Sequence, residues 1–202
     1  SERGALEFET TETRIVFDKE RKIEEIVPVT RNDAHKLIEE CMLMANVATA
    51  RYLKWHKIPM LYRVHEQPLE ERLTNLRTFL GDFGLTLEGG DTPTAHDFAA
   101  VAEKVEGEPH EHLVQTVLLR SMNQAVYQPE NKGHFGLNFE HYAHFTSPIR
   151  RYPDLLIHRG IRHAWTKQGA DNFEYTESKM VDLGQHCSDT CLLYTSDAAD
   201  EP

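Results

Sequence analysis

The residues best suited to chemistry lie together in one basic and aromatic segment. It reads Tyr-Ala-His-Phe-Thr-Ser-Pro-Ile-Arg-Arg-Tyr-Pro-Asp from Tyr142 to Asp154, and His158 and Arg159 follow it. Thr146, Ser147 and Pro148 predict the start of a helix, because hydroxyls cap free backbone amides and proline is tolerated in the first turn. A helix N-terminus attracts anions, whereas Arg150 and Arg151 in that turn oppose the helix dipole. The segment is therefore consistent with a phosphate site.

The two arginines also have a purely structural interpretation. In it, Arg150 and Arg151 pair with carboxylates such as Glu39, Glu40 or Asp154, and the Ser-Pro pair merely starts a helix. Structural ion pairs perturb charges as often as binding sites do. The motif alone leaves the phosphate site and the ion pair open.

Charge is distributed unevenly along the chain. Its 202 residues include 22 Lys and Arg against 33 Asp and Glu, a formal net charge of -11, which argues against a free-standing basic nucleic-acid clamp. Between residues 131 and 167, however, six basic residues accompany two acidic ones, with five histidines besides. Tyr142, Phe145 and Tyr152 are interleaved with these cations, and such rings either stack on nucleobases or belong to the core.

A pair of carboxylates lies within an otherwise apolar helix-forming segment. Asn46 follows Glu39 by seven residues, which places both on one helix face, and Glu40 is adjacent. An unpaired buried charge is costly. Either one glutamate points into a substrate channel or the pair forms structural salt bridges, and the pattern leaves both interpretations open.

Histidines and cysteines give only weak metal patterns. His141 and His144 are three residues apart, but Glu140 precedes them, unlike the zinc-protease helix motif. A second group of possible ligands contains His186, Cys187 and Cys191. It lacks a fourth ligand at usable spacing. The sequence therefore predicts no metal site in this chain.

The three cysteines form no disulfide framework, which favours a reducing cytoplasm. No apolar run approaches the roughly 18 residues that a membrane helix needs.

The predicted elements make this an α+β chain that is mostly helical. A β-hairpin is expected over residues 13–29, around a charged turn at residues 18–21. Thr30 and Asp33 resemble a capping box at the start of a long helix, which a wide apolar stripe predicts to be buried. Further helices are expected over residues 68–81, 95–105, 109–127 and 147–165, the last interrupted or restarted at Pro153.

Several ordered blocks resemble one known family. They are the run from Arg31 to Met42 with Ala45 and Asn46, the block His134-Phe-Gly-Leu, the run from Tyr142 to Leu155, and His158-Arg159. Together they resemble the catalytic domain of the ribonuclease R and ribonuclease II family, nearest to its bacterial ribonuclease R members. The resemblance covers about residues 3–187, and Thr146-Ser-Pro-Ile-Arg150 is its most specific motif.

The resemblance implies a processive, hydrolytic 3′ to 5′ exoribonuclease that feeds single-stranded RNA down a channel and releases nucleoside monophosphates. Such enzymes use a divalent metal, normally Mg²⁺, held by an aspartate cluster. Arg150 matches the family arginine at the scissile phosphate, so it is the predicted catalytic residue. The predicted RNA-binding residues are Glu39, Glu40, Asn46, His134, Thr146, Ser147, Arg151 and Tyr152, with Glu39 favoured over Glu40 as the glutamate at the terminal nucleotide.

The departures from the family pattern are as informative as the match. No aspartate cluster occurs in the sequence, and the flanking RNA-binding barrels that the family implies are missing. Residues 1–187 are therefore expected to be the C-terminal half of a catalytic domain, without the Mg²⁺ ligands and inactive alone. Residues 188–202 match no family pattern and are expected to be a foreign or disordered tail. The alternative is a noncatalytic helical module that binds nucleic acid or protein.

Overall fold

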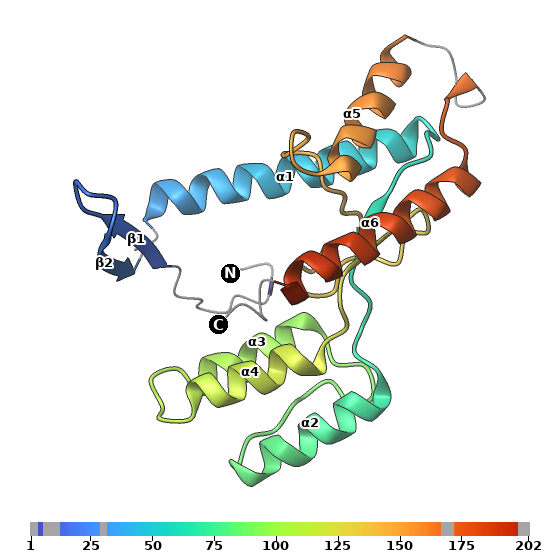
Figure 1. The fold of residues 1–202 in the computed structure, drawn as a ribbon. Coiled ribbons are helices and arrows are strands. Elements are labelled where there is room, and N and C mark those ends of the chain that lie inside the picture. Colours follow the sequence, from blue (N-terminus) through green and yellow to red (C-terminus); the bar gives the residue numbers. More distant parts are fainter. Residues whose placement is uncertain (1–3, 6–12, 29–31, 167–171, 198–202) are drawn as a thin grey trace.

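The computed structural model describes residues 4–5, 13–28, 32–166 and 172–197. Figure 1 shows a mostly helical chain with two small antiparallel sheets, so the predicted α+β class is confirmed. The strands are β1 (Thr13–Phe17), β2 (Ile23–Pro28), β3 (Tyr62–Val64) and β4 (Val126–Gln128). The helices are α1 (Asp33–Trp55), α2 (Glu70–Asp82), α3 (Ala95–Lys104), α4 (Glu111–Ser121), α5 (Tyr152–Trp165) and α6 (Glu177–Asp197).

The N-terminal hairpin forms as predicted. β1 and β2 pair antiparallel from Thr13 opposite Pro28 to Phe17 opposite Ile23, with a register shift between Val16 and Phe17. Their turn is closed by Asp18, whose Oδ1 accepts hydrogen bonds from the backbone N–H groups of Glu20 (2.8 Å) and Lys22 (2.9 Å). This carboxylate replaces backbone partners in the turn, as aspartates commonly do.

The start of α1 corrects the predicted cap. Asn32 is the capping residue: its Oδ1 accepts from the His35 N–H (3.0 Å), and the Asn32 N–H donates to His35 Nδ1 (3.3 Å). Asp33 is the first helical residue rather than the capping partner, and Thr30 lies outside the described residues. An asparagine amide oxygen caps as well as a hydroxyl does, so the cap lies at Asn32, two positions after the predicted Thr30.

Only the second half of α1 is buried, so the predicted buried stripe is wrong for the first half. Leu37 and Ile38 keep 64% and 59% of their surface exposed, whereas Val47 and Leu53 keep 3% and 0%. We call residues 14–28 and 32–42 the arm; none of them is buried. Figure 1 shows the hairpin and the first turns of α1 extending away from the other helices.

Three helices form a separate layer. α2, α3 and α4 pack around a shared apolar core that includes Leu76, Phe98 and Leu118. α2 begins at Glu70, so Pro68 precedes the helix instead of lying in its first turn. α4 ends at Ser121, six residues before the predicted end, because the chain becomes extended at Met122 and then pairs as β4 with β3.

α6 packs closely on β4. A Cβ at Gly184 would lie 2.6 Å from the Tyr127 carbonyl oxygen, so only glycine allows this approach. One turn later, the buried Ser188 accepts from the Tyr127 N–H through its Oγ (2.8 Å). α6 is thus one helix across residues 187 and 188, where we expect family similarity to end; the origin of residues 188–202 stays a prediction, and residues 198–202 lie outside the described residues.

Candidate nucleic-acid interface

The Ser-Pro-Ile-Arg-Arg segment forms a turn before α5 and is not its first turn. The Arg150 and Arg151 N–H groups both donate to the Ser147 carbonyl oxygen (3.3 and 3.0 Å). α5 starts at Tyr152, with Arg151 at the cap position and Pro153 in the first turn. The predicted start at Ser147 is therefore wrong, whereas the predicted restart at Pro153 agrees with the structure, because Pro153 and not Pro148 lies in the first turn. Both arginines lie just before the helix.

Asp154 anchors this turn from within α5. Its side chain is fully buried, and its Oδ2 accepts from the Ser147 N–H (2.7 Å) and from Arg151 Nη2 (2.9 Å). The structural interpretation therefore holds for Arg151, with Asp154 as its partner. Arg150 differs: its side chain is exposed, and within the described part of the chain it forms no ion pair. The turn thus presents one cation that is held in place and one that is available.

A buried asparagine holds the loop that precedes the turn. Asn46 Nδ2 donates to the Tyr142 hydroxyl (3.1 Å), and Asn46 Oδ1 accepts from the Phe145 N–H (2.9 Å). On the other side, His158 stacks on Phe145 with ring centroids 4.3 Å apart. This amide ties α1 to residues 142–145, so Asn46 positions the loop, whatever it contributes to a ligand.

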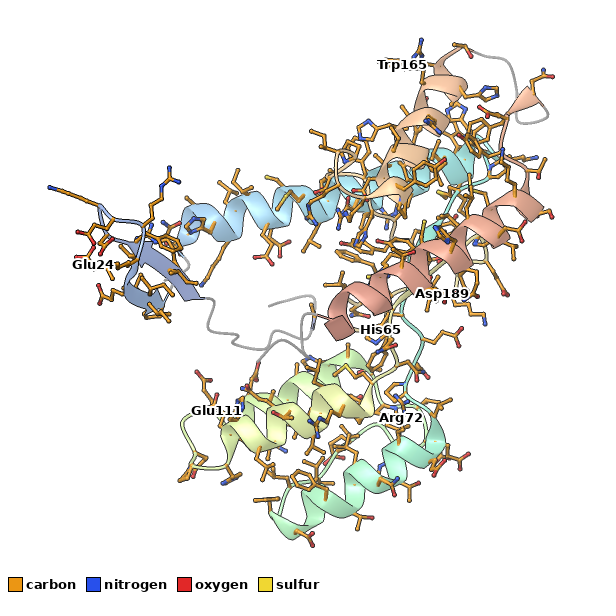
Figure 2. All side chains as sticks on the ribbon, in the orientation of Figure 1. Glu24, His65, Arg72, Glu111, Trp165 and Asp189 are labelled. Carbon is orange, nitrogen blue, oxygen red and sulfur yellow. The ribbon has the colours of Figure 1, made fainter. Side chains whose placement is uncertain are left out.

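The two glutamates lie in a different environment from Asn46. Glu39 and Glu40 are exposed on the arm, whereas Asn46 keeps only 4% of its surface exposed. Figure 2 shows the long course of α1 between these two regions. Along α1, Glu39 and Glu40 precede Asn46 by seven and six residues, which is roughly 10 Å of helix axis.

Four buried or half-buried rings form a cluster beside the loop. The His134 and Tyr142 rings lie 5.1 Å apart, the Tyr142 and His144 rings 5.7 Å apart, and the Tyr127 hydroxyl hydrogen-bonds to His144 Nδ1 (2.8 Å). His65 extends the cluster, with its ring 5.1 Å from that of His134. Rings that are packed edge to face in this way form a rigid wall for the turn.

His134 and His144 of this cluster are neutral. The pKa of His144 is lowered to about 3, chiefly by burial and further by the charges of Arg151, Arg63, His134 and Arg150. Burial likewise lowers the pKa of His134 to about 3, with smaller contributions from His65 and Arg63. Three arginines, from β3 and from the turn, therefore act on the same imidazole. The positive charge at this surface comes from guanidinium groups and not from the histidines.

Sequence reasoning missed the β3 side of this cluster. Arg63 and His65 are two residues apart on an extended segment, which places them on one face of a strand. That alternation was the available signal, but three residues are too short to predict a strand from the pattern alone. Tyr127 was assigned to a helix end, yet it lies in β4 directly opposite Arg63.

Of the aromatic candidates, only Tyr152 offers an open ring. Tyr142 is buried and Phe145 is stacked on His158, whereas Tyr152 keeps 41% of its surface exposed. The Arg159 guanidinium lies 5.8 Å from the Tyr152 ring centre. Beyond Arg159, an open pocket of about 510 Å³ follows α5, lined among others by Arg162, His163, Phe173 and Tyr175.

The described residues do not fit a metal ion. Within residues 4–5, 13–28, 32–166 and 172–197, no three His, Cys, Asp or Glu side chains are arranged to hold one. His141 and His144 have different partners, since His141 contacts Lys54 and His144 binds Tyr127. We therefore derive no step through a metal. In the same part of the chain, no helix has both the length and the apolarity to cross a bilayer.

Comparison with known proteins decides the family. The model of the RNB domain matches residues 1–167. The chain belongs to the RNB domain family. Among curated relatives of this RNB chain, ribonuclease R of Vibrio cholerae is 53% identical over 94% of the chain, and ribonuclease R of Escherichia coli is 48% identical over 93%. The chain spans about a quarter (24%) of the length of either relative.

Solved structures agree with this assignment. Apo ribonuclease R of Mycoplasma genitalium matches 95% of the RNB chain with a TM-score of 0.80 and 29% identity, and the match covers 30% of that protein. Its complex with double-stranded RNA matches with a TM-score of 0.79 and 30% identity. Yeast Ssd1, a pseudonuclease, matches with a TM-score of 0.67 at 22% identity, which shows a shared fold alone.

Proposed function

We propose that this RNB chain supplies the scissile-phosphate contact and part of the RNA channel of a processive, hydrolytic 3′ to 5′ exoribonuclease. The observation that carries the proposal is the exposed Arg150, which forms no ion pair among the described residues and lies in a turn held by the Asp154–Arg151 pair. Curated relatives named ribonuclease R, about half identical to the chain, support this activity. The substrate in this proposal is single-stranded RNA.

Arg150 is the proposed catalytic residue. A guanidinium close to the scissile phosphodiester stabilises the negative charge that develops on the phosphoryl oxygens as water attacks. The buried Asp154 binds Arg151 and the Ser147 N–H, so the backbone of the turn that carries Arg150 is fixed. A preorganised cation of this kind needs little rearrangement during the reaction.

The other proposed RNA contacts follow the same surface. Tyr152 offers its open ring for stacking on a base, and Arg151 adds charge beside it. The remaining proposed contacts are Glu39, Glu40, Asn46, His134, Thr146 and Ser147. For Glu39 and Glu40 the RNA would have to extend along α1 to the arm, and for Asn46 the support is indirect, because its amide already bonds Tyr142 and Phe145.

The test is Arg150→Ala in the full-length protein. We expect kcat to fall by about 100-fold or more, with single-stranded RNA affinity falling much less, because the proposed contact strengthens toward the transition state. Arg120→Ala is the matched control, since Arg120 is an exposed arginine at the end of α4. Equal losses of turnover and affinity would reduce Arg150 to a phosphate tether.

The proposal places the Mg²⁺ ligands in the part of the full-length protein outside this chain. We therefore expect the isolated 202-residue chain to release no nucleoside monophosphates from single-stranded RNA in the presence of Mg²⁺. Release should be measured by chromatography of a labelled RNA. Magnesium-dependent release by a pure sample contradicts this expectation. A cytoplasmic location stays a prediction that follows from the three cysteines.

A noncatalytic binding module is the second candidate. The fold shared with a pseudonuclease shows that this architecture is compatible with loss of hydrolysis. The two candidates differ in one measurement on the full-length protein. Monophosphate release from single-stranded RNA supports the nuclease, whereas salt-dependent RNA binding without any release supports the module.

A further inference from the structure

Arg63 is a cation in the interior of the ring cluster. It lies in the middle of β3, opposite Tyr127 of β4, and its Cζ is 4.6 Å from the centre of the Tyr127 ring. Its Nη1 is buried and forms no hydrogen bond. Within the described part of the chain Arg63 also has no carboxylate partner, in contrast to Arg151 with Asp154 and Lys132 with Glu66. Its positive charge is therefore uncompensated.

The rings around Arg63 are neutral, and Asp154, the carboxylate that acts on the same cluster, binds Arg151 through Oδ2, whereas its buried Oδ1 has no hydrogen-bond partner. Two are histidines, His134 and His144, whose pKa values of about 3 keep them neutral and which Arg63 itself helps to keep neutral. Two are tyrosines, Tyr127 and Tyr142, whose pKa values are raised by burial, so both phenols stay protonated. Asp154 acts on both phenols as well, but its Oδ2 is taken by Arg151.

Such an arrangement is costly unless an anion completes it. A partly buried guanidinium without a counter-charge loses hydration and gains only the ring face of Tyr127. Arg150 and Arg151 act on His144 together with Arg63, so the same cluster carries three guanidinium groups against the single carboxylate of Asp154. The excess charge indicates a ligand with more than one negative group.

We infer that Arg63 is a second phosphate-binding residue of the channel, which holds a phosphodiester of the bound RNA other than the one at Arg150. The inference rests on the proposed function. It adds Arg63 of β3, which is not among the RNA contacts proposed above. The two arginines lie on different elements and both act electrostatically on His144, so one RNA strand that passes the ring cluster can contact both. Stacking on Tyr127 fixes the guanidinium plane and leaves its N–H edge for the phosphate oxygens.

The main experiment measures RNA binding by the full-length protein in EDTA, which prevents hydrolysis by a metal enzyme. The probe is a fluorescein-labelled single-stranded oligoadenylate, and its affinity is measured by anisotropy over a series of KCl concentrations. For Arg63→Ala we expect at least about tenfold weaker binding and a salt slope reduced by about 0.7, the value for one phosphate contact on a single strand. Arg63→Lys should keep the slope but bind more weakly, and Arg120→Ala should match the wild type.

The outcomes separate this inference from the proposed function. If Arg150→Ala lowers the salt slope but Arg63→Ala leaves it unchanged, Arg63 is only a structural cation and the inference fails alone. If the wild-type protein binds no RNA, both fail. Weaker binding with an unchanged slope also overturns the inference, because it reports a disturbed fold and not a lost phosphate.

A second measurement on the wild-type protein covers the case in which Arg63→Ala does not fold. Phenylglyoxal modifies accessible arginines, and mass spectrometry locates the product. We expect Arg63 to react in the free protein and to be protected by saturating oligoadenylate, whereas Arg120 reacts in both. Modification of Arg63 at the same rate with and without RNA overturns the inference, and so does an Arg63 that is already unreactive without RNA.

Discussion

Both halves of α1 carry apolar residues, but their surroundings are opposite. In the arm half, Leu37 and Ile38 are largely exposed, and every residue from 32 to 42 is solvent-accessible. In the other half, Val47, Ala50 and Leu53 are buried, and the latter two share a core with α5 and the segment that follows α1. An apolar stripe shows that a helix can be buried, but the neighbouring elements decide whether it is.

The functional candidates divide along the same line. The turn at Arg150 and the ring cluster lie on the packed half of α1, where Asn46 fixes the loop by two hydrogen bonds. Glu39 and Glu40 lie on the arm. Side chains supported by packed neighbours hold a fixed geometry, whereas side chains on an exposed helix are positioned by the helix alone. Three measurements of stability test this contrast.

The largest expected effect is the loss of the buried ion pair. Asp154→Ala leaves the Arg151 guanidinium partly buried without its partner and removes the acceptor of the Ser147 N–H. We expect the free energy of unfolding to fall by about 3–5 kcal/mol, measured by urea denaturation. The matched change in the arm, Glu20→Ala, removes an exposed ion pair with Lys22 and should cause no measurable loss. A similar loss at both sites would contradict the contrast.

A paired leucine truncation compares the halves of α1 directly. Leu53 is fully buried, and one of its methyl groups lies 3.1 Å from where a Cβ would stand on Gly160 of α5. Leu53→Ala should lower the free energy of unfolding by about 2–5 kcal/mol because it leaves a cavity. Leu37→Ala should change it by less than about 0.5 kcal/mol. Thermal denaturation of both variants, followed by circular dichroism, measures the difference.

Acid should destabilise the packed body through its neutral histidines. The folded pKa values of His134 and His144 are about 3, below the ordinary value of 6.5, so below pH 6.5 the unfolded chain binds protons that the folded chain does not. Stability is therefore present near neutral pH and is lost as the pH falls from about 6.5 toward 3, by up to about 1.4 kcal/mol per pH unit for each histidine. Urea midpoints near pH 7 and about pH 5 test this, and His144→Gln should flatten the dependence. An equally steep dependence in that variant would exclude His144 as a source.

The sequence predicted the elements that carry their own local signals. The hairpin follows from β-branched residues around a charged turn, and α3 follows from the amphipathic spacing of residues 95–105. The motif located the functional turn, but it did not show that the turn precedes α5. Pro148 and Pro153 both fit a first turn, and the buried Asp154, which ties Ser147 and Arg151 from inside the helix, favours Pro153.

Other features depended on distant partners. β3 and β4 are three residues each and are separated by more than sixty positions, so neither has a pattern of its own. The ring cluster exists only because β3, β4 and residues 134–144 come together.

The family, the α+β class and the position of the arginine motif could be read from the sequence, because these depend on residue types at short and fixed spacing. Tertiary structure alone decided which arginine is paired, which half of α1 is buried, and that Arg63 meets the turn across Tyr127 and His144. The physical reason is that ion pairing, burial and pKa depend on distances between groups that are far apart along the chain.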